Sequence, residues 1–188
     1  TKKYGAYLVE DACHALGANY ISKNKKYSAI GSCSYSIAST FSFHAIKNIT
    51  MGEGGCVTTN NKQLADKCRS IVSHGIVKER EKMINPPENS PWYYQMQDIG
   101  WNYRASEVSC ALGLSQFKRI DNIIEKRLKV ALLYKSFLSK NKNILLPKFS
   151  KNNKANGWHL FQLNIDFEKL KIKKESFINY LKKYSIGS

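Results

Sequence analysis

The sequence of 188 residues predicts an α/β fold. Short apolar segments at 5–12 and 38–44 have the length of buried strands, and the first of them ends in acidic residues. A longer segment at 119–140 repeats apolar residues at helical spacing. Strand-like and helix-like segments alternate along the chain, which is typical of layered α/β proteins.

Between these segments the sequence predicts smaller elements. Residues 13–37 read as loop with short segments, and a third strand is expected over 56–59. Asn61 is expected to cap a helix over 62–73, because its side chain can accept a hydrogen bond from the first turn. Residues 74–101 contain glycines and three prolines and are expected to form a long excursion. Loops of that length tend to be functional or to pack on a partner.

The C-terminal part is expected to be mainly helical. A helix is predicted over 104–117, followed by the longer helix over 119–140. The apolar stripe of the longer helix consists of Ile120, Ile123, Ile124, Leu128, Ala131 and Leu138. A proline and a polar run indicate a hinge or linker over 141–156. A strand over 158–165 and an amphipathic helix over 174–184 complete the prediction.

Charge and cysteine content restrict the class of protein. Lysine and arginine outnumber aspartate and glutamate by 30 to 14, which gives a net charge of +16. These lysines are scattered over predicted helix faces, so we favour a solvated surface over a nucleic-acid site. The five cysteines lack C-x-x-C spacing, which argues against a zinc site and suits reduced thiols in a cytoplasmic protein. No apolar run has the length of a membrane span.

The most informative feature is a lysine between a strand and a glycine-rich turn. Lys47 follows the strand at 38–44 and precedes the glycines of 52–55, while Asp11 ends the first strand. Such a lysine can form a Schiff base with an aldehyde cofactor, and a carboxylate can keep a pyridine nitrogen protonated. Glu10 would face the opposite side of its strand, so Asp11 is the favoured acid. The glycines are better explained by a tight turn than by a phosphate cradle.

Several segments carry a resemblance to a known family. They are residues 9–18 (VEDACHALGA), 41–47 (FSFHAIK), 52–55 (GEGG) and 100–104 (GWNYR). In this order they resemble the DegT/DnrJ-type sugar aminotransferases, which are fold-type I pyridoxal-phosphate enzymes that aminate keto-sugars attached to a nucleotide. Further segments resemble the branch that makes the pseudaminic acid precursor. These are residues 31–36, 73–76 and 91–97.

The resemblance covers about the middle half of a family chain. It implies that residues 1–140 are the C-terminal part of a cofactor-binding large domain and that 141–188 begin a smaller domain. Because the sequence begins with Thr1 and stops just after a predicted helix, we expect both ends to interrupt structure. The family's N-terminal phosphate-binding helix start would lie outside this sequence.

The resemblance also implies roles for single residues. Lys47 would hold the cofactor and move the substrate proton, and Asp11 would pair with the pyridinium nitrogen. His14 would contact the phenolic oxygen of the cofactor, and Ser42 would donate a hydrogen bond to its phosphate. Asn102 would reach across a homodimer interface to the phosphate in the partner's site.

The predicted function is pyridoxal-phosphate-dependent transamination of a UDP-linked 4-keto-6-deoxy-N-acetylhexosamine, with glutamate as the amino donor. We expect a cytoplasmic homodimer that uses no metal and binds neither nucleic acid nor a membrane. The chain alone is expected to be inactive. Lys47 argues against the lysine-lacking dehydratases of the same family. His44 and Arg104 receive no role.

Two alternatives stay open. The first is the same chemistry on another nucleotide-linked keto-sugar. The second is an inactive remnant or a basic binding module, because this chain lacks the N-terminal phosphate site.

Overall fold

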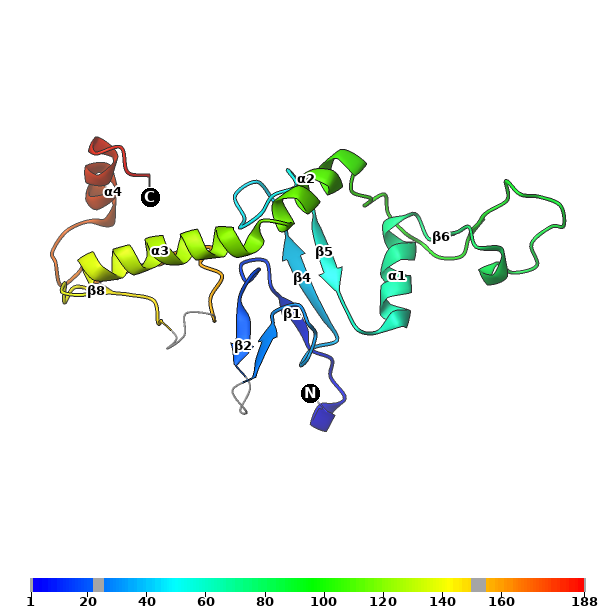
Figure 1. The fold of residues 1–188 in the computed structure, drawn as a ribbon, viewed down its shortest axis with the longest axis horizontal. Coiled ribbons are helices and arrows are strands. Elements are labelled where there is room, and N and C mark those ends of the chain that lie inside the picture. The colour runs from blue at the N-terminus through cyan, green and yellow to red at the C-terminus, as the bar shows by residue number, and fades with distance from the viewer. Residues whose placement is uncertain (1, 22–25, 150–154, 188) are drawn as a thin grey trace.

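The computed structural model describes residues 2–21, 26–149 and 155–187, and it has the predicted α/β character (Figure 1). The strands are β1 (Val9–Asp11), β2 (Asn19–Ile21), β3 (Tyr27–Ala29), β4 (Ala38–Ser42), β5 (Gly55–Thr58), β6 (Ile76–Val77), β7 (Gln95–Met96), β8 (Ile144–Leu145) and β9 (Asn164–Ile165). The α-helices are α1 (Lys62–Val72), α2 (Glu107–Phe117), α3 (Ile120–Leu138) and α4 (Lys174–Lys183). Short 3-10 helices lie at Lys2–Tyr4 and Arg80–Lys82.

The central sheet has the strand order β1-β4-β5. β1 and β4 are parallel, with Asp11 opposite Thr40, whereas β5 runs antiparallel to β4, with Gly55 opposite Ser42. The carboxyl ends of β1 and β4 therefore meet at the same edge of the sheet, and ligands of open α/β sheets bind at such edges. β4 is the buried strand, since Ala38, Ser39 and Phe41 all have little exposed surface.

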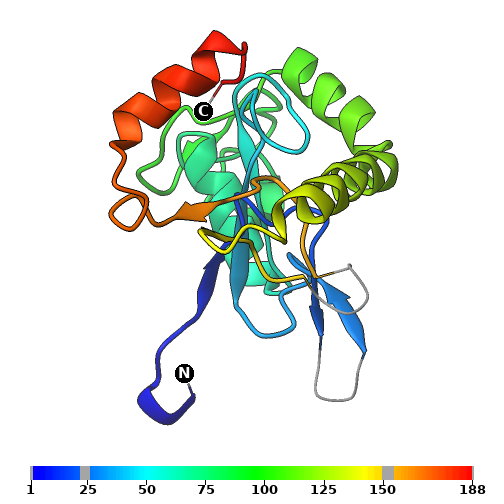
Figure 2. The same cartoon turned by 90° about the vertical axis from the view of Figure 1, so that its left-hand side faces the viewer.

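The prediction of a buried strand over 5–12 was wrong in length and in burial. β1 contains only the last part of that segment, and Val9 is 57% exposed. β1 is an edge strand, because β4 is its neighbour in the sheet and no second neighbour pairs with it within the described residues. Figure 2 shows the segment before β1 extending away from the rest of the ribbon.

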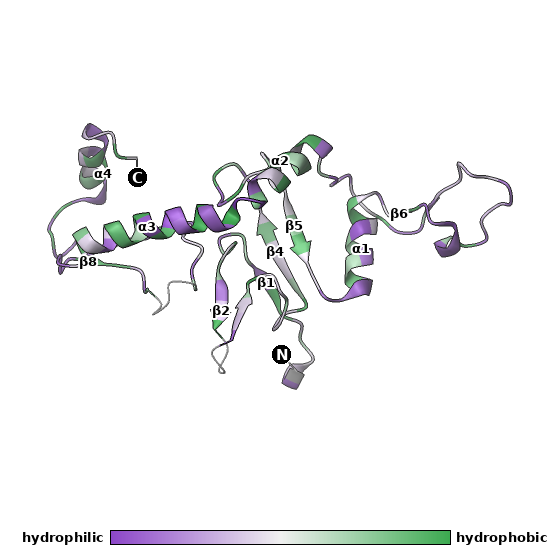
Figure 3. Ribbon diagram, in the orientation of Figure 1, coloured by the Kyte–Doolittle hydropathy of each residue, from purple (hydrophilic) through white to green (hydrophobic). Residues whose placement is uncertain are grey.

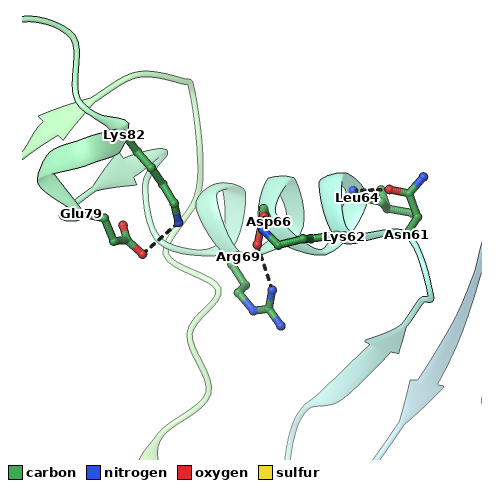
Figure 4. A network of polar contacts seen from close by, with 7 residues as sticks. All are labelled: Asn61, Lys62, Leu64, Asp66, Arg69, Glu79 and Lys82. Carbon is green, nitrogen blue, oxygen red and sulfur yellow. Dashed lines mark hydrogen bonds and ion pairs between the residues drawn. The ribbon is translucent and has the colours of Figure 1, made fainter.

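The first long helix agrees closely with its prediction. The Asn61 side chain accepts a hydrogen bond from the backbone nitrogen of Leu64 at 3.0 Å, which caps α1 as expected. The Asp66 carboxylate on this helix forms ion pairs with the side-chain nitrogens of Lys62 and Arg69, at 3.0 and 3.2 Å (Figure 4). These partners are exposed, so the pairs add little to stability. Figure 4 also shows the pair of Lys82 with Glu79, beyond the C-terminal end of α1.

The predicted strand over 158–165 was wrong for most of its length. The structure has only the two-residue β9 there, paired with β8, which itself lies inside the predicted linker. Trp158 has a φ of 50°, which a strand cannot accommodate. Its ring packs instead against Phe149 and Phe161, with centroid distances of 4.6 and 6.0 Å. Part of the predicted hinge, residues 150–154, lies outside the described residues, and the division into two domains stays a prediction.

Residues 13–37 contain more structure than the sequence suggested. β2 and β3 form an antiparallel pair, with Tyr20 opposite Ser28. Residues 22–25 lie outside the described part of the chain. The predicted helices over 104–117, 119–140 and 174–184 are confirmed as α2, α3 and α4, each with shorter bounds.

Much apolar surface is exposed on the helices and on the excursion between α1 and α2. Apolar segments (green) and polar segments (purple) alternate along α3 in Figure 3. Val108, Leu133 and Phe137 are exposed on α2 and α3. Patches of this kind mark surfaces that other segments or subunits cover.

Three further observations bear on the class of protein. Searching the described residues finds no helix with the length and apolar character needed to cross a bilayer. The same residues contain no cluster of histidine, cysteine and acidic side chains that could hold a metal ion. All five cysteines are free thiols, and Cys33 is buried.

Candidate active site

The edge where β1 and β4 end carries most of the predicted site residues. Asp11 is the last residue of β1, and its carboxylate accepts a hydrogen bond from the backbone nitrogen of Cys13 at 3.1 Å. Ser42 is the last residue of β4. Lys47 lies in the turn that follows, where its backbone nitrogen donates to the carbonyl of His44 at 3.0 Å.

The turn after β4 is closed by backbone hydrogen bonds on both sides. Phe43 donates to Gly54 at 2.8 Å, and Met51 donates to Phe43 at 2.9 Å. A Cβ on Gly55 would lie 2.2 Å from the carbonyl oxygen of Phe41, so only glycine permits this approach of β5 to β4. The glycine cluster therefore serves the return of the chain to the sheet, as the tight-turn interpretation expects.

Asp11, His14 and Lys47 interact electrostatically. Hydrogen bonds from the Cys13 side chain and backbone lower the pKa of Asp11, and the positive charges of His14 and Lys47 lower it further. Asp11 is exposed and ionised at neutral pH. An anionic carboxylate at the sheet edge therefore lies within electrostatic range of an imidazole and an amine.

The neighbouring carboxylate of Glu10 has a different environment. Its oxygens accept hydrogen bonds from the hydroxyl groups of Tyr20 and of the buried Ser39, the latter at 2.7 Å. Burial raises the pKa of Glu10, but these two hydrogen bonds, together with the Ser36 side chain, outweigh burial and lower the pKa. Burial and the Glu10 charge raise the pKa of Tyr20 to about 12. Glu10 is thus engaged in structure, which leaves Asp11 as the acid beside Lys47.

His44 is held within the turn. Its Nε2 lies 3.4 Å from Glu53, and its Nδ1 accepts a hydrogen bond from the backbone nitrogen of Ile46 at 3.4 Å. Its own backbone nitrogen donates to the Ser42 hydroxyl oxygen at 3.4 Å. These contacts give His44 a structural place in the turn that presents Lys47.

Asn102 lies apart from this cluster. It forms an isolated antiparallel bridge with Ser73, just beyond α1, and its side chain is exposed. Among the described residues no hydrogen bond or ion pair connects it to the sheet edge that carries Lys47. Arg104 is exposed as well. Four of the five predicted site residues therefore lie at or just after the ends of β1 and β4, whereas Asn102 lies on another segment, beyond α1.

Sequence reasoning missed His159. Its ring centroid lies 4.5 Å from that of His14, and Arg127 of α3 donates to the carbonyls of Trp158 and His159 at 3.1 and 3.3 Å. Burial lowers the pKa of His159, and the positive charges of His14, Lys47 and Arg127 lower it further. The sequence around His159 does not indicate this contact, because His14 lies 145 positions away and the two rings meet only in the tertiary fold.

Asn48 was also missed. It is 7% exposed, and its Nδ2 donates to the carbonyls of Leu16 and Gly157 at 3.0 and 2.8 Å. The position directly after Lys47 was the available signal, but nothing in the sequence indicates burial there.

The residues at the sheet edge fit a cofactor that has an aldehyde and a pyridine ring. Lys47 offers an amine, Asp11 an anionic acceptor, and Ser42 a hydroxyl donor. His14 adds an imidazole within electrostatic range of Asp11. This donor set matches the chemistry of pyridoxal phosphate, which needs a lysine and a partner for its pyridinium nitrogen.

Comparison with known proteins gives a family match over the whole chain. The model of the DegT/DnrJ/EryC1/StrS aminotransferase family matches residues 1–188. A UDP-4-amino-4,6-dideoxy-N-acetyl-beta-L-altrosamine transaminase of Campylobacter jejuni is 38% identical over 186 residues, which are 99% of this chain and 44% of that protein. The spore coat polysaccharide biosynthesis protein SpsC of Bacillus subtilis is 32% identical over 100% of this chain and 46% of its own length.

A solved structure also resembles the chain. It is Helicobacter pylori PseC, an aminotransferase involved in the biosynthesis of pseudoaminic acid. The TM-score is 0.78 at 31% identity, over 97% of this chain and 44% of the PseC chain. The present chain therefore spans less than half the length of the relatives it matches.

Proposed function

The chain belongs to the DegT/DnrJ/EryC1/StrS aminotransferase family, and from this premise we propose that the whole protein transfers an amino group to a nucleotide-linked keto-sugar. The observation that carries the proposal is the placement of the ionised Asp11 carboxylate at the carboxyl ends of two parallel strands, within electrostatic range of His14 and Lys47. Aminotransferases of this family depend on pyridoxal phosphate, and the donor set at this edge suits that cofactor.

Lys47, Asp11 and His14 would each have a different role in the proposed reaction. When bound, pyridoxal phosphate supplies an aldehyde for covalent attachment and a ring that withdraws electrons from the reacting carbon. Lys47 would provide the attaching amine, and its Nζ would be the base and acid that moves the proton of the substrate carbon. Asp11 would keep a proton on the ring nitrogen, because its lowered pKa makes it a stable anion. His14 would contact the phenolic oxygen of the ring, the role that the family resemblance implies.

The proposed substrate is a UDP-linked 4-keto-6-deoxy-N-acetylhexosamine, with glutamate as donor. The similar transaminases of Campylobacter jejuni and Helicobacter pylori are named for a UDP-linked 4-amino-4,6-dideoxy sugar. A 4-amino group introduced by transamination requires a 4-keto precursor. The likeness to PseC, an aminotransferase involved in the biosynthesis of pseudoaminic acid, supports the same class of substrate.

The proposed assembly is a cytoplasmic homodimer. Asn102 is exposed and separate from Lys47 of its own chain, which suits a residue that serves the partner's site. The apolar surface of α2 and α3 offers area that a second subunit can cover.

The test uses the whole protein that contains this chain, with pyridoxal phosphate, glutamate and the UDP-linked 4-keto sugar. We expect 2-oxoglutarate and a UDP-linked 4-amino sugar in equal amounts, measured by coupled assay and mass spectrometry. Turnover of a dTDP-linked 4-keto sugar alone would instead select another nucleotide sugar. Absence of turnover together with absence of bound cofactor would support a non-catalytic protein and contradict the proposal.

A further inference from the structure

A buried amide lies directly after the candidate catalytic lysine. Asn48 uses one side-chain nitrogen to donate to two backbone carbonyls, Leu16 at 3.0 Å and Gly157 at 2.8 Å. Because both neighbours are acceptors, the amide nitrogen must face them and the orientation of the side chain is determined. Ile49 beside it is also buried, so this end of the turn is anchored in the core.

The two carbonyls belong to the segments that carry the two histidines of the site. Leu16 lies in the turn after β1, which contains His14 and is closed by a hydrogen bond from Ala18 to Ala15 at 2.9 Å. Gly157 lies two residues before His159. Asn48 therefore connects the turn that presents Lys47 to the segments of His14 and His159 at once.

The segments of Leu16, Asn48 and Gly157 are tightly packed where they meet. A Cβ on Gly157 would lie 2.3 Å from the carbonyl oxygen of Leu16 and 3.1 Å from Nδ2 of Asn48. The segment of His159 is held from its other side by Arg127 of α3, which donates to the carbonyls of Trp158 and His159. The histidine rings then meet at a centroid distance of 4.5 Å.

The other half of the amide is not satisfied. Oδ1 of Asn48 is buried and finds no hydrogen-bond partner within the described residues. A buried unpaired acceptor is destabilising, so stability alone does not explain an asparagine here. The two donated bonds, and the geometry that they impose, are what this side chain contributes.

We propose that Asn48 is a positioning residue for the transamination, which sets the placement of the Lys47 amine relative to His14 and His159 by joining their segments. This inference rests on the proposed function. Asn48 touches no reacting atom; it acts through the three backbone segments that meet at its amide nitrogen. Loss of that junction would let the lysine turn and the histidine segments move independently.

The experiment compares Asn48→Ala and Asn48→Leu with Ser39→Ala in the whole protein. Leucine matches asparagine in shape without donors, which guards against the case in which the alanine variant fails to fold. Ser39 is the matched control, because it is buried and gives its hydroxyl hydrogen to Glu10, away from Lys47. We measure kcat and KM, the induced circular dichroism of bound cofactor, and the melting temperature.

For both Asn48 variants we expect kcat to fall about a hundredfold, the size of effect that a small misplacement of reacting groups produces. The induced circular dichroism should change, whereas KM for the sugar should stay nearly constant. Ser39→Ala should lower only the melting temperature. The inference is overturned if the Asn48 variants behave like Ser39→Ala while the wild-type protein is active. An inactive, cofactor-free wild type would instead contradict the proposed function.

Discussion

The turn between β4 and β5 and the excursion between α1 and α2 are both irregular, yet they differ in the burial of their side chains. In the turn, Asn48 and Ile49 are 7% and 2% exposed, although neither belongs to a helix or strand. In the excursion, Trp92 and Ile99 are 75% and 80% exposed. One loop is built into the core of this chain, and the other presents large apolar side chains outward.

This difference indicates which parts of the candidate site the chain can organise by itself. Asp11, His14 and Lys47 are placed by the β1–β4 pairing and by the anchored turn, all within this chain. Asn102 follows the exposed excursion, and among the described residues no hydrogen bond or ion pair joins it to the sheet edge that carries Lys47. Apolar residues so exposed are typical of surfaces that a partner covers.

Lys47→Ala tests the anchored turn with the largest expected effect. We expect turnover to fall about ten-thousandfold or more, since both covalent attachment and proton transfer are lost. Borohydride reduction of the wild-type whole protein followed by peptide mapping should place the cofactor on Lys47. Lys62→Ala, a surface lysine of α1, is the control and should retain activity. Labelling of a different lysine would refute the assignment.

Asp11→Asn sharpens the contrast between two adjacent carboxylates. Cofactor should stay bound, but kcat should fall about a hundred- to a thousandfold, because a neutral amide cannot stabilise positive charge on the ring nitrogen. Glu10→Gln should instead lower the melting temperature with kcat little changed, since Glu10 bonds to Tyr20 and Ser39. Near-normal turnover of Asp11→Asn would mean that another acid pairs with the ring.

Mixing two inactive variants tests whether Asn102, which follows the exposed excursion, serves the active site of a partner subunit. Lys47→Ala and Asn102→Ala, both in the whole protein, are combined and allowed to exchange subunits. If sites are shared, each heterodimer contains one intact site, so roughly a quarter of wild-type activity should return on random pairing. If Asn102 serves its own subunit, every mixed site retains a lesion and no activity returns.

The sequence was sufficient for the helices, whose signals lie in neighbouring residues. Asn61 predicted the start of α1 because capping depends on neighbouring residues. The choice of Asp11 over Glu10 followed from side-chain alternation in a strand, and the structure indeed separates the environments of the two carboxylates. The family match supports the resemblance seen in the motifs.

Contacts between distant segments could not be obtained in that way. The prediction of a strand over 158–165 was wrong because Trp158 has a left-handed backbone conformation, in which its ring packs against Phe149 and Phe161. Asn48 and His159 look unremarkable in sequence, since their partners lie 109 and 145 positions away. Periodicity reports which face of an element is apolar, but it does not report which segment will cover that face.

The smallest expected effect concerns the pH dependence of stability and involves His159. Its pKa is lowered in the folded state by burial and by the charges of His14, Lys47 and Arg127. Between the lowered pKa of the folded state and the ordinary pKa of histidine, the unfolded chain therefore binds more protons than the folded one. The free energy of unfolding rises with pH over that range. The contribution of His159 is fully present above its ordinary value of about 6.5 and is lost as pH falls toward the lowered pKa.

The measurement is the melting temperature of the holoprotein between neutral and mildly acidic pH. His159→Gln should flatten its decline on acidification, because the titrating group is gone. His44→Gln is the matched control, since His44 is more exposed and lies beside Glu53, and it should retain the wild-type decline. If the melting temperature of His159→Gln declines as steeply as that of the wild type, protonation of His159 does not cause the acid sensitivity. The acid sensitivity would then belong to the carboxylates of the sheet edge instead.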